Sequence, residues 1–414
     1  AFSWNGFMPG NVEEARDYYA VDGLPVAEGV EPGHPFNPST GEPYAPQPVF
    51  RGDFTRVLAE YWADGPDSET PPGHWFTLLN YVNDQPELQR KWRGLGEPLA
   101  PLDWDVIAYF SMGGAMHDAA IAAWSCKGWH DYVRPVSALR WMADRGQCAD
   151  PELPNYHGAG LPIIPGFIEQ IGPDDPEALR GPDNEYLYEM KIRCWKGPDF
   201  IEVPALQHAG VDWIRAREWW PYQRPTFVTP PFAGYVSGHS TFSRAAAEVL
   251  TALTGDAYFP GGLGAFPVEA HEFLVFEDGP STDFELQWAT YRDAADQSAL
   301  SRIWGGIHPP IDDFPGRAMG EIVGMDAFML AEQYAFPLLG TDCFEAGGYP
   351  CLCPGDFNSD GLRNLPDLLL LLVHFGDPVD LGGDGASPVL DLDGSGDINT
   401  GDLLGMLTVW GQPC

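Results

Sequence analysis

Apolar residues recur at every third or fourth position over several stretches of the chain, which is the spacing that one face of an α-helix requires. Residues 54–62 and 75–82 form two short stretches of this kind. A longer stretch over residues 104–126 predicts a buried helix that carries Lys127 at its end. Within this helix, the pair Gly113-Gly114 is expected to permit close packing against a neighbour.

Three more stretches with helical spacing follow in the second half of the sequence. Residues 242–253 form the first, and Gly255 is placed to cap it. The other two are marked by stripes of apolar residues, namely Trp288, Tyr291, Ala295 and Ala299, then Met319, Ile322, Val323, Met329 and Leu330. Residues 146–229 are predicted to be loops, because alternating strand patterns are scarce. We therefore predict an all-α fold, a large helical bundle followed by a small module.

The charge of the chain limits the partners it can have. Its 414 residues include 60 Asp and Glu against 22 Lys and Arg, which gives a formal net charge of -38. Such a surface repels nucleic acids and anionic membranes. The longest apolar run, residues 368–373, is far shorter than the ~20 residues that cross a bilayer. We therefore expect a small-molecule partner, no nucleic acid and no membrane span.

The start of the chain and its cysteines bear on its location. Residues 1–10 have neither a basic start nor an apolar stretch, as expected after removal of a signal peptide. Four of the seven cysteines fall within residues 343–414, where a small module would need disulfides. The sequence contains no Cys-x-x-Cys pair, so we do not expect a zinc site. The odd number of cysteines leaves one free thiol, which we place at Cys126. We expect a secreted or cell-surface protein.

Three short segments combine cationic, hydroxyl and imidazole groups. They are Lys127 with Arg134-Pro135, then Ser237-Gly238-His239, then Ser301-Arg302 with His308 and Asp312. Lysine and arginine donors, a serine hydroxyl and the helix N-terminus at His239 favour a bound oxyanion. Asp312 lies four residues after His308, so it can hold one ring nitrogen while the other bonds to a metal or phosphorus atom. The pattern predicts an oxyanion site anchored on His308.

This spacing closely resembles that of one superfamily, which contains the vanadium haloperoxidases and the type 2 phosphatidic acid phosphatases. The shared motifs are Lys, six residues, Arg-Pro; Ser-Gly-His; and Ser-Arg, five residues, His, three residues, Asp. The motifs span Lys127 to Asp312, and the helical pattern extends the resemblance over residues 1–340. One position departs from the family pattern, because Val236 stands where a proline usually precedes Ser-Gly-His.

The resemblance to vanadium haloperoxidases implies vanadate as the cofactor, with His308 as its axial ligand. The implied oxygen-binding residues are Lys127, Arg134, Ser237, Gly238 and Arg302. His239 would be the acid-base residue, Lys127 would help to polarise bound peroxide, and Asp312 would orient His308. Trp124 and Phe232 match positions where fungal chloroperoxidases carry the same residues beside the halide. The implied reaction oxidises bromide or chloride with hydrogen peroxide to hypohalous acid, which halogenates a small organic acceptor.

Two other functions use the same residues. A secreted acid phosphatase of this superfamily would bind phosphate with the same donors and form a phosphohistidine on His308. The 61 residues between His239 and Ser301 and the absence of membrane spans favour the haloperoxidase, because the lipid phosphatases are compact and membrane-embedded. A catalytically inactive surface binding protein is the third possibility, and the complete set of motifs argues against it.

Two acidic loops near the C-terminus have the spacing of EF-hand-like calcium loops and lie 35 residues apart. The ligands expected in the first are Asp356, Asn358, Asp360, the carbonyl of Leu362, and Asp367. Those expected in the second are Asp391, Asp393, Ser395, Asp397 and Asp402. A short apolar helix follows each loop, over residues 368–375 and 403–410. The repeat predicts two bound calcium ions.

The repeat resembles a type I dockerin, because Asp occupies position 12 of each loop and each loop leads into only one helix. The resemblance implies a cohesin-like or cell-surface partner, although Leu365-Pro366 and Thr400-Gly401 depart from the usual Ser-Thr type of contact residues. Tying together the ends of such a unit would pair Cys353 with Cys414, and Cys343 with Cys351 in the linker. We predict a haloperoxidase-like helical domain over residues 1–342, a linker over 343–350 and a dockerin-like module over 351–414.

Overall fold

The computed structural model describes residues 15–17, 34–63, 69–176, 185–338, 355, 357, 363, 365–378, 390, 392, 395 and 397–411. The chain divides into two compact units. The first comprises residues 1–88, 111–251 and 256–328, and the second comprises residues 89–110, 252–255 and 329–414. The boundaries predicted at residues 342 and 351 lie outside the described residues and stay predictions.

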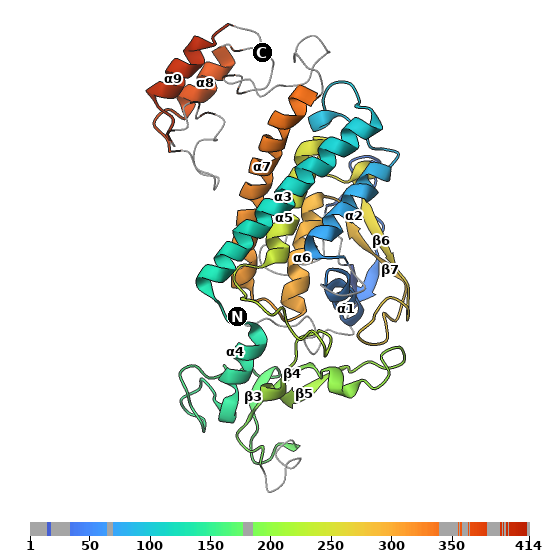
Figure 1. The fold of residues 1–414 in the computed structure, drawn as a ribbon. Helices are drawn as coiled ribbons and strands as arrows, with labels where there is room; N and C mark the ends of the chain where they lie inside the picture. The colour runs from blue at the N-terminus through green and yellow to red at the C-terminus, as the bar shows by residue number, and fades with distance from the viewer. Residues whose placement is uncertain are drawn as a thin grey trace. The chain divides into compact units, whose positions relative to one another are not determined.

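Helices are the main elements of the described chain, and Figure 1 shows them as coiled ribbons. The α-helices are α1 (Arg51–Tyr61), α2 (Pro71–Asp84), α3 (Pro101–His130), α4 (Pro135–Met142), α5 (Gly238–Thr254), α6 (Tyr291–Trp304), α7 (Pro310–Leu338), α8 (Leu365–Val373) and α9 (Thr400–Thr408). The strands are β1 (Ala15–Asp17), β2 (Pro48–Phe50), β3 (Ile168–Gln170), β4 (Met190–Trp195), β5 (Val211–Arg215), β6 (Gly264–Val268) and β7 (Phe284–Trp288). Single 3-10 turns lie at Trp92–Gly94, Asp144–Gly146, Pro198–Phe200, Ala216–Glu218 and Pro260–Gly262.

The helices predicted from apolar periodicity are present. Helices α1, α2 and α3 contain the three stretches of the first half, and α3 carries Lys127 in its last turn. Helix α5 ends at Thr254, and Gly255 follows it with a positive φ of 71°, as the predicted cap requires. One prediction is wrong, because Trp288 belongs to strand β7 and not to α6. Helix α6 starts later because Thr290 and Asp293 form a capping box at its N-terminus.

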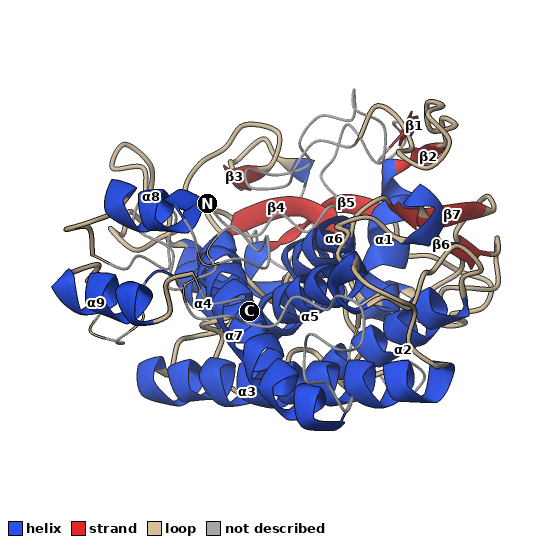
Figure 2. Ribbon diagram, turned by 90° about the horizontal axis from the view of Figure 1, so that it is seen from above, coloured by secondary structure: helices blue, strands red, loops and turns tan. Residues whose placement is uncertain are grey.

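The fold is mainly helical but not all-α, because three small antiparallel sheets accompany the helices. Their strand orders are β1-β2, β3-β4-β5 and β6-β7, and Figure 2 shows the strands at the periphery of the helices. The three-stranded sheet lies within residues 146–229, which the sequence predicts to be loops. Its strands are short, and the buried positions of β4 come in pairs at Met190-Lys191 and Cys194-Trp195. An alternating pattern is therefore missing from its sequence.

The three-stranded sheet supports the start of α4, where Arg134 is the N-cap residue. Val136 and Leu139 of α4 pack in one buried cluster with Ile168, Met190 and further residues of the sheet. At the other end of the helix, the Arg140 Nε–H donates to the carbonyl oxygen of Trp219 over 2.9 Å. These contacts place α4, and with it Arg134, in a defined position within the first unit.

Helix α7 packs its backbone directly against α5 along three glycines spaced by four residues, Gly316, Gly320 and Gly324. A Cβ atom on Gly324 would lie 2.5 Å from the carbonyl oxygen of Ala245, and one on Gly320 would overlap the carbonyl oxygen of Thr241. The apolar stripe predicted for α7 is therefore not its most closely packed face, and Leu330 is 49% exposed. The close packing predicted at Gly113-Gly114 is also wrong, because a Cβ there would meet open space.

These two sets of glycines predict opposite effects of the same substitution. Gly320→Ala should destabilise the fold by about 1–3 kcal/mol, because the added methyl group overpacks the α5–α7 contact. Gly114→Ala, in the middle of α3, should stabilise it by about 0.5–1 kcal/mol, because alanine favours the helix and meets open space. Urea unfolding followed by circular dichroism measures both. Equal changes in the two variants would contradict the proposed α5–α7 contact.

Three cysteines in the described part of the chain are free thiols, namely Cys126, Cys148 and Cys194. The prediction for Cys126 is confirmed, but the inference that only one thiol stays free is wrong. Cys148 and Cys194 are buried in the cluster below α4, and burial raises the pKa of the Cys194 thiol. They serve as small apolar core residues, a common use of cysteine. Cys343, Cys351, Cys353 and Cys414 lie outside the described residues, so their pairing stays a prediction.

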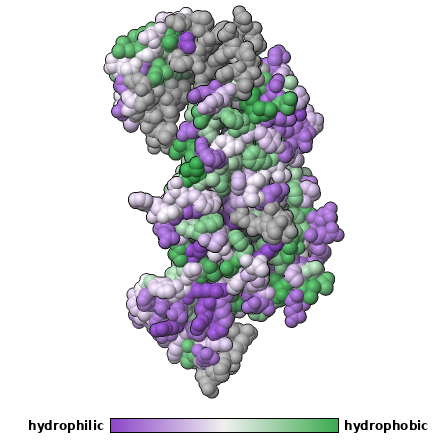
Figure 3. Space-filling model, in the orientation of Figure 1, coloured by the Kyte–Doolittle hydropathy of each residue, from purple (hydrophilic) through white to green (hydrophobic). Residues whose placement is uncertain are grey.

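On the face drawn in Figure 3, hydrophobic side chains lie between hydrophilic ones without forming a continuous belt. Within the described ranges, no helix combines the length and apolar character that crossing a lipid bilayer requires.

Candidate oxyanion site

The three predicted motif segments meet within the first unit. Lys127 comes from the last turn of α3, Arg134 from the N-cap of α4, and Arg302 from the last turn of α6. The Ser-Gly-His segment starts α5, and His308 and Asp312 lie at the start of α7. The side chains of this site are almost fully buried, namely Lys127, Arg134, Ser237, His239, Arg302, His308 and Asp312. Burial of so many charged groups at one place requires compensating partners.

The loop before α5 holds two of the cations through its backbone carbonyls. The Lys127 Nζ donates to the carbonyl oxygens of Ala233 over 3.0 Å and Gly234 over 2.8 Å. The Arg134 guanidinium donates to the carbonyl oxygens of Phe232 over 2.8 Å and Ala233 over 3.2 Å. The sequence does not reveal this role of residues 232–234, because backbone carbonyls are common to all residue types. The loop fixes where both positive charges point.

A tight turn brings His308 beside Arg302. After α6 ends, Gly305 and Gly306 reverse the chain, and Gly306 has a positive φ of 80° that favours glycine. The carbonyl oxygen of Arg302 then accepts the amides of Ile307 over 3.1 Å and His308 over 3.3 Å. The Gly305-Gly306 pair before His308 thus has a structural explanation.

His308 is held with a defined tautomer. Its Nδ1 lies 2.7 Å from Asp312 Oδ2, and its Nε2 lies 2.9 Å from Arg134 Nη1. Because a guanidinium only donates, Nε2 must accept, and the ring proton therefore resides on Nδ1. Burial lowers the pKa of His308 well below its usual range, and the charges of Arg134 and Lys127 lower it further. His308 is thus a neutral imidazole whose Nε2 carries no proton and accepts the hydrogen bond from Arg134.

Asp312 is fully buried, unlike an ordinary surface carboxylate. Burial raises its pKa to about 6, although the charges of Lys127 and Arg134 act in the other direction. Above this pH the carboxylate is ionised and accepts a hydrogen bond from the Nδ1–H of His308. Its backbone carbonyl also accepts the amide of Ser237 over 2.8 Å. Asp312 therefore connects the anchor histidine to the Ser-Gly-His segment.

Among the described residues whose charges act on Lys127, cations outnumber carboxylates. Burial lowers the pKa of Lys127 to about 7, and Arg134 lowers it further while Asp312 raises it. The carboxylate of Asp312 is the acidic group that acts on Lys127, against the two guanidinium groups of Arg134 and Arg302. An oxyanion bound among these side chains would compensate their repulsion and favour the charged form of Lys127.

This imbalance predicts that binding of an oxyanion takes up a proton. Without an anion, a Lys127 pKa of about 7 leaves its amine about nine-tenths neutral at pH 8. Sulfate does not titrate near this pH, and its charge should raise the Lys127 pKa, so about one proton should be bound with it. Affinity should consequently fall as the pH rises above 7. Calorimetry of sulfate binding in two buffers with different ionisation enthalpies measures the uptake.

A variant of Lys127 tests whether its amine is the group that takes up the proton. Lys127→Met keeps the length of the side chain without its amine, so proton uptake should be lost and sulfate should bind more weakly. Heats of binding that are independent of the buffer in the unmodified protein would contradict the depressed pKa of Lys127.

The start of α5 is built by short contacts. The hydroxyl of Ser237 accepts the amide of Ser240 over 3.3 Å, which caps the helix. Gly238 is required by a close neighbour, because a Cβ on it would lie 3.0 Å from the ring of Trp124. Its amide, together with the Ser237 hydroxyl, stands at the positive end of the helix dipole. Val236, which departs from the family pattern, is fully buried.

His239 is neutral and held by a residue that the motifs do not include. Its Nε2 lies 2.7 Å from the carbonyl oxygen of Trp62, just beyond the end of α1. A carbonyl only accepts, so Nε2 carries the ring proton and Nδ1 is left as an acceptor. Burial lowers the pKa of His239 well below its usual range, and the charge of Arg302 lowers it further.

A buried ion-pair network lies beside the site and joins α5, α6 and α7. Asp313 accepts the Ser240 hydroxyl over 2.7 Å and two hydrogen bonds from Arg317, each 2.9 Å long. Arg317 also pairs with Asp296 of α6 over 2.7 Å. The Asp313-Arg317 spacing of four residues on one helix is the signal that could have revealed this pair in the sequence. The network fixes the Ser-Gly-His segment relative to Asp312.

Trp124 and Phe232, predicted to flank the halide, lie side by side next to Lys127. Their ring centroids are 5.1 Å apart, and the Lys127 Nζ lies 5.6 Å and 5.4 Å from them. The two residues are 41% and 38% exposed, in contrast to the buried polar residues. They form the partly open, aromatic side of the site.

The calcium loops are described only in part. Asp356, Asn358, Asp360, Leu362, Asp391 and Asp393 lie outside the described residues, whereas Asp367, Ser395, Asp397 and Asp402 are described. Asp367 and Asp402, at position 12 of the two loops, have equivalent environments. Both are fully buried, and each accepts a hydrogen bond from the backbone amide at position 2 of its own loop. These hydrogen bonds are Phe357 N to Asp367 over 2.7 Å and Leu392 N to Asp402 over 2.6 Å. Among the described residues, no group of three or more His, Cys, Asp or Glu side chains is placed to hold a metal.

A small apolar core accompanies these loops in the second unit. It consists of Leu371, Leu390, Ile398 and Met406, with partly buried neighbours around them. The helices α8 and α9 that carry two of these residues follow the two loops, as the sequence repeat predicts.

Comparison with known proteins gives one family match. Residues 107–336, more than half of the chain, match the family model described as "VCPO second helical-bundle domain". Among solved structures, the apo form of a bacterial vanadium-dependent chloroperoxidase is 20% identical, with a TM-score of 0.46 over 68% of this chain and 45% of that one. Its holo form is 18% identical with a TM-score of 0.44.

The chain is also similar to a third solved structure. A bacterial vanadium-dependent iodoperoxidase is 19% identical, with a TM-score of 0.37 over 67% of this chain and 43% of that one. The chain thus spans less than half the length of these solved structures. No curated protein matches the chain.

Proposed function

The chain belongs to the vanadium haloperoxidase family, and on that premise we propose that its oxyanion site binds vanadate and catalyses oxidation of a halide by hydrogen peroxide. The observation that carries the proposal is the neutral His308, whose Nε2 lone pair faces a cluster of three cations. Vanadate would need a nitrogen ligand that carries no proton and an excess of positive charge around its oxygens.

The residues present fit vanadate. His308 Nε2 would bind the metal, while Lys127, Arg134 and Arg302 would hold the negatively charged oxygens. The Ser237 hydroxyl and the Gly238 amide would add neutral donors at the positive end of α5. Bound vanadate would supply the Lewis-acid chemistry that activates hydrogen peroxide for attack by bromide or chloride, with hypohalous acid as the product.

The protein's own groups then have separate tasks. Asp312 holds the His308 proton on Nδ1 and so keeps Nε2 free of a proton. The Trp62 carbonyl holds the His239 proton on Nε2, which leaves Nδ1 of His239 to accept a proton from a reacting group. Lys127, with a pKa near 7, can gain a proton when negative charge develops beside it. Trp124 and Phe232 would form the side from which the halide and a small organic acceptor approach.

An assay of two reactions tests this proposal. Purified protein with peroxide and bromide should brominate a phenol dye only when orthovanadate is added, and should not hydrolyse p-nitrophenyl phosphate. Phosphate hydrolysis without bromination would favour the acid phosphatase with His308 as its nucleophile. Vanadate binding without either reaction would favour an inactive binding protein. His117→Ala is a suitable control, because His117 is an exposed residue of α3.

We also propose that the C-terminal segment binds two calcium ions and forms a dockerin-like module. Support comes from the equivalent, fully buried Asp367 and Asp402, which end two loops of the same spacing. Each of these carboxylates accepts a backbone amide, and a calcium ion would add the positive charge that compensates a buried negative one. The cohesin-like or cell-surface partner and the secreted location stay predictions from the sequence.

A further inference from the structure

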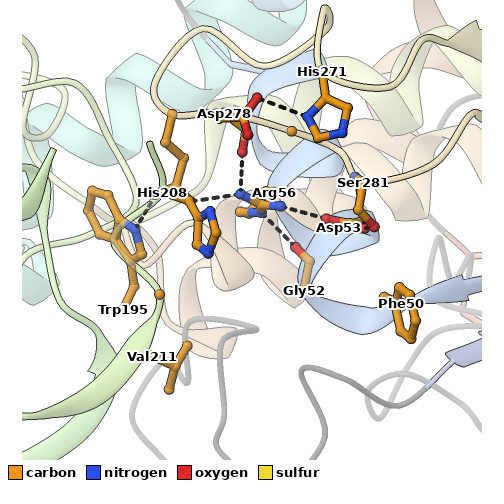
Figure 4. Close-up of a pocket in the computed structure, with 13 residues that line it drawn as sticks. Phe50, Gly52, Asp53, Arg56, Trp195, His208, Val211, His271, Asp278 and Ser281 are labelled. Carbon is orange, nitrogen blue, oxygen red and sulfur yellow. Dashed lines mark hydrogen bonds and ion pairs between the residues drawn. The ribbon is translucent and has the colours of Figure 1, made fainter. Parts of the chain in front are cut away.

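A cavity of about 580 Å³ lies in the first unit and shares no residue with the oxyanion site. It is formed by the start of α1, by strands β4 and β5, and by the loop over residues 271–281. Its volume falls in the range of about 300–1,000 Å³ that is typical of small-molecule sites. Figure 4 shows that side chains from these three parts surround it.

The one arginine among the lining residues is already engaged by the protein. Arg56 donates to Glu277 over 3.1 Å, to Asp53 over 2.5 Å, and to the backbone carbonyls of Gly52 and Asp278 over 3.1 Å and 2.9 Å. Figure 4 shows these interactions converging on its guanidinium. Arg56 is therefore a structural cation and does not offer its charge to an anionic ligand.

Carboxylates give the cavity an excess of negative charge. Asp53, Glu277 and Asp278 line it, so three carboxylates face one guanidinium when the lining histidines are neutral. Asp53 and Glu277 are buried and satisfied by further donors, such as the Ser281 hydroxyl and the Trp195 Nε1–H. Asp278 differs from them, because its side chain is 21% exposed and its Oδ1 pairs with His271 over 3.0 Å.

A further buried carboxyl group, that of Glu60, interacts with the lining residue Glu277. Burial raises the pKa of Glu60 to about 7, and the charge of Glu277 contributes to the rise against several hydrogen bonds. The Tyr222 hydroxyl donates to Glu60 over 2.8 Å and its ring packs on Trp195, 4.9 Å between centroids. With a pKa near 7, Glu60 is partly protonated at neutral pH, so the negative charge that would repel an anionic ligand comes from the lining carboxylates.

Apolar surface makes up the rest of the lining. Phe50, at the end of β2, and Val211, at the start of β5, lie on either side of the view in Figure 4, with the Trp195 ring nearby. Phe50 is 42% exposed, so its ring is accessible to a ligand. Aromatic and aliphatic walls beside a carboxylate suit a ligand with an apolar ring and a cationic group.

We infer that this cavity binds an organic cation, namely a primary alkylamine that carries an aromatic ring, with its ammonium group beside Asp278 and its ring against Phe50 and Val211. This inference does not depend on the proposed haloperoxidase function. Binding should occur without vanadate and without peroxide, so failure of one proposal leaves the other intact.

Calorimetry with three ligands of one shape tests the inference. The probes are tryptamine, the neutral alcohol tryptophol and the anion indole-3-propionate, each titrated into the full chain at pH 7.5. Tryptamine should bind with one site and at least about tenfold more tightly than tryptophol, because only the amine gains the carboxylate. Indole-3-propionate should not bind. Equal affinities for the three probes, or no saturable binding of tryptamine, would overturn the inference.

Variants separate a role in binding from a role in folding. Asp278→Asn should reduce tryptamine affinity to that of tryptophol and leave tryptophol unchanged. Asp118→Asn is the matched control, because Asp118 also pairs with a histidine, over 2.9 Å, but lies on α3 outside the cavity. His271→Ala keeps the Asp278 carboxylate and should leave tryptamine binding unchanged or tighter. Val211→Trp should fill the cavity and abolish binding of both indoles.

Two results with these variants would refute the site. One is a loss of tryptamine affinity in Asp118→Asn equal to that in Asp278→Asn, which would assign the effect to the overall charge. The other is full binding in Val211→Trp with an unchanged circular dichroism spectrum, which would place the ligand elsewhere.

Discussion

His308→Ala should abolish bromination and weaken vanadate binding together, whereas His239→Ala should abolish most turnover and leave vanadate binding near normal. His308 offers the unprotonated nitrogen of the site, so its loss leaves only the charges of the cations to hold the anion. The Trp62 carbonyl holds the ring proton of His239 on Nε2, so His239 offers its Nδ1 for proton transfer. Loss of a general acid-base lowers turnover by roughly 10²- to 10⁴-fold.

Equilibrium dialysis of vanadate beside a bromination assay measures both quantities. His117→Ala, on the exposed side of α3, should change neither. Both site histidines are buried, so thermal unfolding of each variant must show that the fold is kept. Unchanged vanadate affinity in folded His308→Ala would remove His308 from its assigned role. A parallel loss of vanadate affinity in His239→Ala would show that the two histidines are not separated in function.

Removal of calcium should unfold the C-terminal module and leave the helical bundle intact. Among the described residues, the core there consists of Leu371, Leu390, Ile398 and Met406 with a few partly buried neighbours, and a core of this size rarely offsets the entropy of ordering the segment alone. The buried carboxylates of Asp367 and Asp402 would then lack the cation that compensates their burial. Limited proteolysis with and without a chelator should release fragments from residues 351–414 only.

Single substitutions refine this test. Asp402→Ala should lower the calcium stoichiometry from two to one and make the module sensitive to protease at low calcium. Asp377→Ala is the control, because Asp377 is half exposed, pairs with His374 and lies outside both loops. Equal protease resistance of the tail with and without chelator would refute a structural role for calcium.

Local patterns were sufficient to predict most helices. The apolar spacing in α1, α2, α3 and α5 is present in the sequence itself, and the predicted cap at Gly255 depends on nearest neighbours only. The strands β3, β4 and β5 could not be predicted in this way. They are three to six residues long, and their pairing joins distant residues such as Ile192 and Ile214. A strand of this length becomes stable only when its partner is present.

Glycines illustrate the same limit. Gly113-Gly114 in α3 and the line of Gly316, Gly320 and Gly324 in α7 are equally plausible contact sites by sequence. Only the second set meets another backbone, that of α5. A missing side chain permits close approach, but the approach itself depends on where the rest of the chain places the neighbouring helix.

For the oxyanion site, the sequence by itself determined which chemical groups are available, because the residue types and spacings of the motifs are local. The tertiary structure decided their protonation and orientation. Lys127 is held by carbonyl oxygens more than a hundred residues away, at Ala233 and Gly234, and His239 by that of Trp62. Burial and neighbouring charges then lower the pKa values of Lys127 and His308. Solvent exclusion and distant backbone partners arise only when the whole chain is folded, so a motif cannot specify them.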